Sequence, residues 1–149
     1  MKKNIFTAFT LLLLISCNSN TPKNSINLTE RIINMLHTQT AAWNNGSIDS
    51  FMSIGYWNSD SLQFITKKGI KYGYQSVLKS YKRSYPNKEA MGHLAFTNLK
   101  VMSLDDNNEV YQVYGHWAVI KDSMSASGVF SLIVNNINGQ PRIVIDHTY

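Results

Sequence analysis

The chain has 149 residues, a formal charge of +5 at pH 7, 44% hydrophobic residues and a single cysteine. This length fits one domain with a substantial core, and one cysteine excludes an intramolecular disulfide framework or a cysteine-based zinc finger. Charged residues make up only 15%, which argues against global disorder, and the positive charge is too weak and scattered to indicate nucleic-acid binding.

The N-terminus has the pattern of a targeting segment. Lys2 and Lys3 precede a mostly apolar stretch, 5–15, that is short for a membrane span. The run Leu14-Ile15-Ser16-Cys17 resembles the lipobox of bacterial lipoproteins. The resemblance implies cleavage before Cys17 and attachment of a diacylglyceryl group to its sulfur, which would anchor the chain in a membrane. An ordinary secretory signal with a chance cysteine is the alternative.

These features divide the chain into three parts. We expect a lipoprotein signal peptide at 1–16, the lipidated Cys17 with a polar, flexible tether at 17–26, and a folded domain at 27–149. The expected location is the cell envelope, with the domain facing the periplasm.

The first part of the domain shows helical signals. Asn27 and Glu30 have the spacing of a helix N-cap, and apolar residues at helical intervals predict a long amphipathic helix that ends before Gly46. Ser47 can cap a short second helix over 48–53.

A small hairpin and another helix should follow. The runs 62–65 and 70–74 flank a glycine-containing turn, which predicts two short antiparallel strands. Residues 74–84 carry apolar side chains on one side of a helix, and Pro86 closes it.

The rest of the chain alternates with the two-residue period of strands. Short turns separate the runs, except for a loop at 122–127, so consecutive strands should pair as an antiparallel meander. The predicted strands are 93–103, 109–121, 128–137 and 142–148.

Helices followed by a run of strands predict an α+β fold. A sheet with helices on one face must curl around them to bury both apolar surfaces. We therefore expect a cone-shaped α+β barrel, in which a curved meander sheet packs against the N-terminal helices.

This arrangement resembles the nuclear transport factor 2-like superfamily, in particular its SnoaL-like branch and small bacterial domains of unknown function. The resemblance extends over about 28–149 and implies a cone with an internal pocket. It is carried by the runs 42–48, 51–52, 56–57, 60–64, 69–73, 81–86, 115–117, 128–133 and 143–148.

Three functions are compatible with this resemblance. The first is a membrane-tethered domain that binds an apolar or aromatic small molecule without turnover. The second is a proton-transfer enzyme similar to ketosteroid isomerase, a dehydratase or a cyclase, although the isomerase pattern cannot be matched residue by residue. The third is a homodimerising interaction domain with a vestigial pocket.

Aromatic residues are the first candidates for a pocket wall, since tyrosine and tryptophan combine a large apolar body with one polar group. Ordinary core packing is the competing interpretation for each of them. The candidate ligand-binding residues are Tyr56, Trp57, Tyr72, Tyr81 and Trp117, with Asp146 beside them.

Asp146 and His147 stand next to each other near the end of the last strand, so a regular strand would turn only one of them inward. His147 shares its face with Ile143 and Ile145, the more apolar set, and we expect it to face the interior as a candidate acid or base. Asp60, at the expected mouth of the cone, is a second candidate base, with a turn role as its alternative.

The histidine and cysteine spacings match no metal-binding motif, and the chain has no phosphate-binding glycine loop. We therefore expect no metal and no cofactor.

A homodimer is expected through the outer face of the sheet, where Gln112, Tyr114, His116 and Asn136 should lie.

Overall fold

The computed structural model describes residues 27–122 and 125–149. The predicted signal peptide at 1–16, the lipidation site Cys17 and the tether up to residue 26 lie outside the described residues. Within the described part, no helix has the length and apolar character needed to cross a membrane.

Two capped helices begin the domain. In α1 (Leu28–Asn44), the side chain of Asn27 accepts a hydrogen bond of 2.9 Å from the Glu30 amide, as the N-cap pattern predicts. Gly46 then adopts a φ of +83°, which favours glycine and ends the helix. Ser47 caps α2 (Ile48–Gly55), which runs two residues beyond its predicted end.

Two more helices connect the small hairpin to the first long strand. The helix α3 (Tyr74–Ser84) has its predicted bounds. A one-turn helix, α4 (Lys88–Met91), was not predicted. It forms because the Asn87 side chain caps it by accepting a hydrogen bond from the Ala90 amide.

Six strands form a single sheet in the order β2-β1-β6-β5-β4-β3. The meander from β3 to β6 is antiparallel as predicted, whereas β1 pairs with β6 in parallel. The strand β5 begins at Ser125, inside the segment expected to be a loop, because 125–127 pair with the end of β4. The strands are β1 (Gln63–Thr66), β2 (Gly69–Tyr72), β3 (His93–Ser103), β4 (Val110–Ile120), β5 (Ser125–Ile137) and β6 (Gln140–Thr148).

A β-bulge changes the alternation of side chains in β6. Neighbouring residues Ile133 and Val134 of β5 oppose Ile145 and Ile143, so Val144 is an extra residue in β6. Ile143 and Asp146, three residues apart, are both buried as a result.

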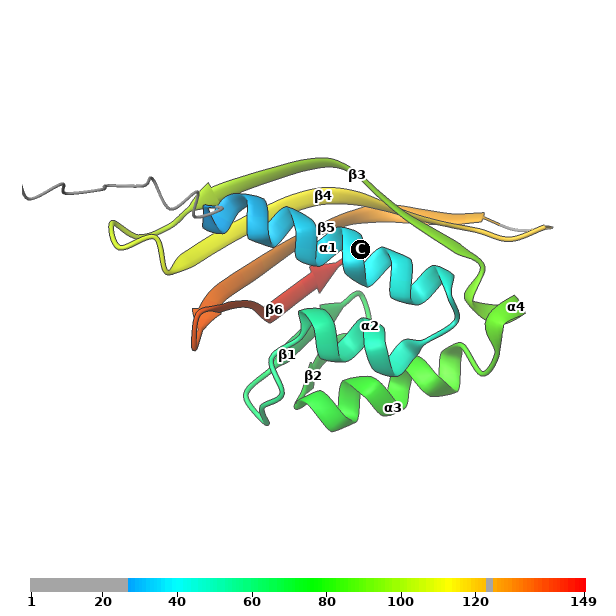
Figure 1. The fold of residues 1–149 in the computed structure, drawn as a ribbon. Helices are drawn as coiled ribbons and strands as arrows, with labels where there is room; N and C mark the ends of the chain where they lie inside the picture. The colour runs from blue at the N-terminus through cyan, green and yellow to red at the C-terminus, as the bar shows by residue number, and fades with distance from the viewer. Residues whose placement is uncertain (1–26, 123–124) are drawn as a thin grey trace, which may run out of the picture.

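The helices α1, α2 and α3 lie on one side of the sheet, which curves over them (Figure 1). The core fills the space between these layers and includes Leu36 of α1, Met52 of α2, Val77 of α3 and Val113 of β4. The α+β class and the curved sheet packed against N-terminal helices are thereby confirmed.

Candidate functional site

A cavity of about 300 Å³ lies between the helices and the concave face of the sheet. Aromatic side chains dominate its wall, and Asp146 is the one charged residue among those that line it. Hydroxyl side chains of Thr66, Ser80, Ser84 and Thr148 also contribute. The aromatic wall residues are Trp43, Phe51, Tyr56, Phe64, Tyr81, Tyr85, Phe96, Trp117 and Phe130.

The helix α3 supplies one side of the cavity through residues at helical spacing. Val77, Ser80, Tyr81 and Ser84 recur at intervals of three and four, which places them along one face. Tyr81 is the centre of an aromatic cluster. Its ring centroid lies 5.5 Å from Phe51, 5.7 Å from Phe64 and 6.0 Å from Trp43, all at steep edge-to-face angles.

A short chain of hydrogen bonds surrounds the carboxyl group of Asp146. The Tyr56 hydroxyl donates to Asp146 Oδ2 at 2.6 Å, and the Thr148 hydroxyl donates to Oδ1 at 2.5 Å. The Tyr81 hydroxyl lies 3.4 Å from that of Tyr56. Because the Tyr56 hydrogen is directed to the carboxyl, Tyr81 is the donor in this longer contact. Both carboxyl oxygens are thus oriented by the protein.

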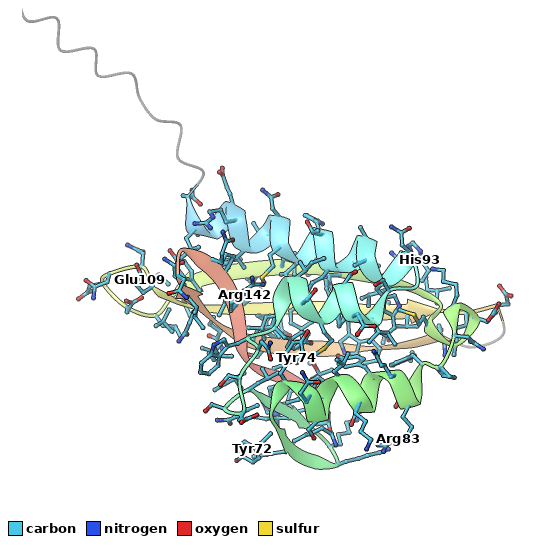
Figure 2. The ribbon with its side chains drawn as sticks, turned by 60° about the horizontal axis from the view of Figure 1, so that its bottom comes forward. Tyr72, Tyr74, Arg83, His93, Glu109 and Arg142 are labelled. Atoms are coloured by element: carbon cyan, nitrogen blue, oxygen red, sulfur yellow. The ribbon has the colours of Figure 1, made fainter. Side chains whose placement is uncertain are left out.

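Tyr56 and Asp146 are brought together by α2 and β6. Tyr56 follows α2 directly and forms an isolated bridge with Ile143. The guanidinium of Arg142 donates to the carbonyl oxygens of Ser53, at 2.9 Å, and Ile54, at 2.5 Å, and so binds the C-terminal end of α2 to β6. Arg142 lies beside that helix in Figure 2.

Burial controls the titration of this group. Asp146 is only 4% exposed, and removal from water raises its pKa above the ordinary value, although the hydrogen bonds from Thr148 and Tyr56 and the charge of His147 act in the opposite direction. Burial and the nearby carboxylate raise the pKa of Tyr56, and burial raises that of Tyr81. Both phenols therefore stay protonated near neutral pH and remain donors.

The expectation that His147 faces the interior is wrong. Because Val144 is an extra residue, Asp146 turns into the cavity and His147 to the other side of β6. The His147 ring packs against Tyr149, at 4.3 Å between centroids, and its Nδ1 lies 3.1 Å from the Tyr149 hydroxyl. His147 does not line the cavity and is withdrawn as a catalytic candidate.

Three further candidates also lie away from the cavity wall. Asp60 is exposed in the turn before β1, as its alternative interpretation had it. Trp57 is half-buried, and its amide donates to Ile143 O at 3.0 Å, which directs the backbone along β6. Tyr72, on the edge strand β2, is 58% exposed, and its side chain points away from the body of the protein (Figure 2).

Four of the candidates do lie on the wall, namely Tyr56, Tyr81, Trp117 and Asp146. His116 is exposed, as expected for the outer face. Sequence reasoning missed Thr148, Tyr85 and Phe96 as wall residues. The position of Tyr85 one turn beyond Tyr81 was the available signal for that residue.

Within 27–122 and 125–149, no group of three or more histidine, cysteine, aspartate or glutamate side chains is arranged to hold a metal ion. A molecule in the cavity would contact one carboxyl group, the hydroxyl groups beside it and an apolar wall.

Comparison with solved structures defines the class of this protein. A protein of unknown function from Shewanella oneidensis MR-1, described as NTF-2 like, is 32% identical, with a TM-score of 0.77 over 82% of this chain and 98% of its own. The chain therefore belongs to the nuclear transport factor 2-like superfamily.

More distant structures share the fold alone. An NTF2-like protein of unknown function from Pseudomonas putida KT2440 has a TM-score of 0.63 at 12% identity, over 80% of this chain and 83% of its own. An NTF2-like superfamily protein from Salmonella enterica serovar Typhimurium LT2 has a TM-score of 0.59 at 10% identity, over 83% and 92%. No protein-family model and no curated protein sequence matches the chain.

Proposed function

We propose that this domain binds a small, largely apolar molecule inside the cone and holds its polar end at Asp146. The observation that carries the proposal is the cavity of about 300 Å³, with nine aromatic wall residues and one buried, hydrogen-bonded carboxyl group. Following the sequence-based expectation, we propose further that a lipid on Cys17 tethers the domain to the membrane on its periplasmic side.

The size and chemistry of the cavity support ligand binding. Its volume is at the lower end of the range of about 300–1,000 Å³ typical of small-molecule sites. An apolar wall with a few oriented polar groups is also typical of such sites, since apolar burial supplies affinity and polar groups supply orientation. A vestigial pocket, by contrast, would be filled by the side chains of Tyr56, Tyr81 and Trp117, which here line an open space.

A second candidate function is proton transfer. A buried carboxyl with a raised pKa can take a proton from a weakly acidic substrate, and Asp146 meets this condition. The chain of hydroxyl groups from Tyr81 through Tyr56 would keep this carboxyl group oriented as the base. Ligand binding is the better supported function, because the described wall holds a single carboxyl group and no histidine or second carboxyl group opposite it.

The test of ligand binding is native mass spectrometry of the purified full-length chain. Ser80 lines the cavity from α3, so Ser80→Trp fills part of it, whereas Lys79→Trp adds the same side chain at the exposed neighbouring position. We expect wild type and Lys79→Trp to carry a bound small molecule that is lost after denaturation and refolding, and Ser80→Trp to carry less. Equal occupancy in both variants would contradict binding in the cone.

The same molecule tests the second candidate function. Once identified from the mass spectra, it is incubated in deuterated water with wild type and with Asp146→Asn. Deuterium incorporation that requires Asp146 would establish proton abstraction, whereas binding without exchange would leave the domain as a binding module.

A further inference from the structure

We propose that the cavity selects organic cations, namely small molecules in which a protonated amine is attached to an apolar or aromatic group, with the Asp146 carboxylate as the counter-ion. This proposal rests on the proposed ligand-binding function and names the class of ligand.

The distribution of charge around the cavity is one-sided. The residues that line it include Asp146 but no lysine, arginine or histidine. Among the described residues, the ion pair is formed by Lys82 and Asp49, at 2.7 Å between exposed side chains, and neither residue lines the cavity. An anionic ligand would therefore meet a buried carboxyl without any compensating cation, whereas a ligand amine would supply the missing charge.

The carboxyl group also has free capacity to bind donors. An ionised carboxylate offers about four acceptor positions on its two oxygens. Tyr56 occupies one position on Oδ2, and Thr148 occupies one on Oδ1. The remaining positions suit the several N–H donors of an ammonium group, and the two existing bonds keep the carboxylate oriented to receive it.

Aromatic rings surround the same end of the cavity. Phe64 is the residue directly paired with Asp146 across β1 and β6, and Tyr81 reaches the Tyr56 hydroxyl from α3. Phe64 and Tyr81 have centroids 5.7 Å apart. Aromatic rings attract a cation through the negative charge of their faces, which adds to the attraction of the carboxylate.

Cation binding should be coupled to the release of a proton. The titratable groups around Asp146 are Tyr56 after α2, Tyr81 on α3, Tyr85 just after α3, and the neighbouring His147 on β6. The three tyrosines stay neutral, since burial raises the pKa of each, so Asp146 is the cavity group whose titration sets the pH dependence. Affinity for an amine should rise with pH through the titration of Asp146, while affinity for a neutral molecule should not.

Three indole probes of similar size but different charge test the proposal by calorimetry on the full-length protein. They are tryptamine, a cation; 3-propylindole, which is neutral; and indole-3-acetate, an anion. We expect tryptamine to bind about 10- to 100-fold more tightly than 3-propylindole, as for a hydrogen bond to a charged group, and indole-3-acetate to bind most weakly.

Two variants and a pH series then test whether Asp146 causes the preference for tryptamine. Asp146→Asn keeps the shape of the side chain and should remove the preference for tryptamine, while the matched control Asp60→Asn, outside the cavity, should retain it. If Asp146→Asn fails to fold, wild type alone decides through the pH series. Tryptamine affinity that rises with pH, with proton release seen in buffers of different ionisation enthalpy, supports the proposal.

Equal binding of tryptamine and 3-propylindole, or strongest binding of indole-3-acetate, would overturn the cation proposal and leave the proposed ligand-binding function standing. Binding of none of the three probes overturns the cation proposal as well. The native mass spectra of Ser80→Trp and Lys79→Trp then decide independently whether the cavity holds any molecule.

Discussion

Asp146 combines two properties that rarely coexist in a protein interior, since its carboxyl group is buried and has no basic partner on the cavity wall. The hydroxyls of Tyr56 and Thr148 satisfy one acceptor position on each oxygen. Such a group weakens the fold when it is ionised, because the charged form loses its hydration. A buried ionisable group that lowers the stability of the fold is a candidate functional residue.

The raised pKa of Asp146 predicts a specific pH dependence of stability. The folded state holds the proton more tightly than the unfolded chain, whose aspartate titrates near pH 3.9, so the free energy of unfolding should fall as pH rises from about 4 through the folded-state pKa. The fall is at most about 1.4 kcal/mol per pH unit. Urea unfolding at several pH values should show it as a difference between wild type and Asp146→Asn.

The control for this experiment is Asp60→Asn, because Asp60 is exposed and lies outside the cavity. Asp60→Asn retains Asp146 and should therefore retain the fall in the free energy of unfolding that Asp146 causes. A difference between wild type and Asp146→Asn that stays level, or in which wild type gains stability as pH rises, would show that burial does not dominate the titration of Asp146.

The side of the sheet that Asp146 faces can be predicted from the sequence only if β6 is a regular strand. The alternation of Ile143, Ile145 and His147 favoured an inward histidine, and Val144 breaks that alternation. A bulge depends on how the neighbouring strand pairs, and no local residue pattern around Val144 marks it. Tyr81 and Trp117 do lie on the wall, as expected, because the periodicity of α3 and β4 is undisturbed around them.

At the scale of the elements, the site depends on the junction of α2 with β6. Arg142 binds the last carbonyl groups of α2, and Tyr56 follows that helix by one residue. Carbonyl groups at a helix C-terminus have no partner within the helix and carry partial negative charge. The guanidinium group therefore supplies the missing hydrogen bonds and also offsets that charge.

Arg142→Ala should therefore weaken both the fold and the site. We expect a loss of about 1–3 kcal/mol in the free energy of unfolding, as for hydrogen bonds to a charged group, measured by urea denaturation. Arg83→Ala provides the matched control, since Arg83 is exposed on α3 (Figure 2) and should cost no more than about 0.5 kcal/mol. Equal effects of the two substitutions would contradict a role for Arg142 in holding α2.

Most element bounds could be predicted because capping residues, glycines and periodicity are local signals. The bounds of α3 and β3 matched their predicted ranges. The parallel pairing of β1 with β6 could not be predicted, since it joins segments about eighty residues apart and four-residue strands carry little pattern of their own. That pairing places Phe64 beside Asp146 and so helps to build the cavity.

At the scale of the whole molecule, the outer face of the sheet exposes large side chains. Tyr114 and Met102, on neighbouring strands, are 43% and 55% exposed. If the domain forms the expected homodimer through this face, Tyr114→Glu should shift the mass in analytical ultracentrifugation towards the monomer. Tyr72→Glu, at the opposite edge of the sheet, should leave the mass unchanged, and a monomeric wild type would refute the expectation.

The lipid anchor is a second prediction for the whole chain. Expression with radiolabelled palmitate should label the wild type and not Cys17→Ser, which has no thiol to accept the diacylglyceryl group. The labelled protein should sediment with membranes, whereas Cys17→Ser should be released. Labelling that persists in Cys17→Ser would contradict the assignment, because the chain has no other cysteine.

The three tryptophans permit the most direct test that the cone is a binding site. Trp43 and Trp117 line the cavity, whereas Trp57 lies outside it. The protein is labelled with 5-fluorotryptophan, its ¹⁹F resonances are assigned with single Trp→Phe variants, and tryptamine and 3-propylindole are titrated in turn. With at least one probe, we expect saturable shifts of the Trp43 and Trp117 resonances and a constant Trp57 resonance. A shift at Trp57 alone, or no saturable shift with either probe, would contradict this expectation.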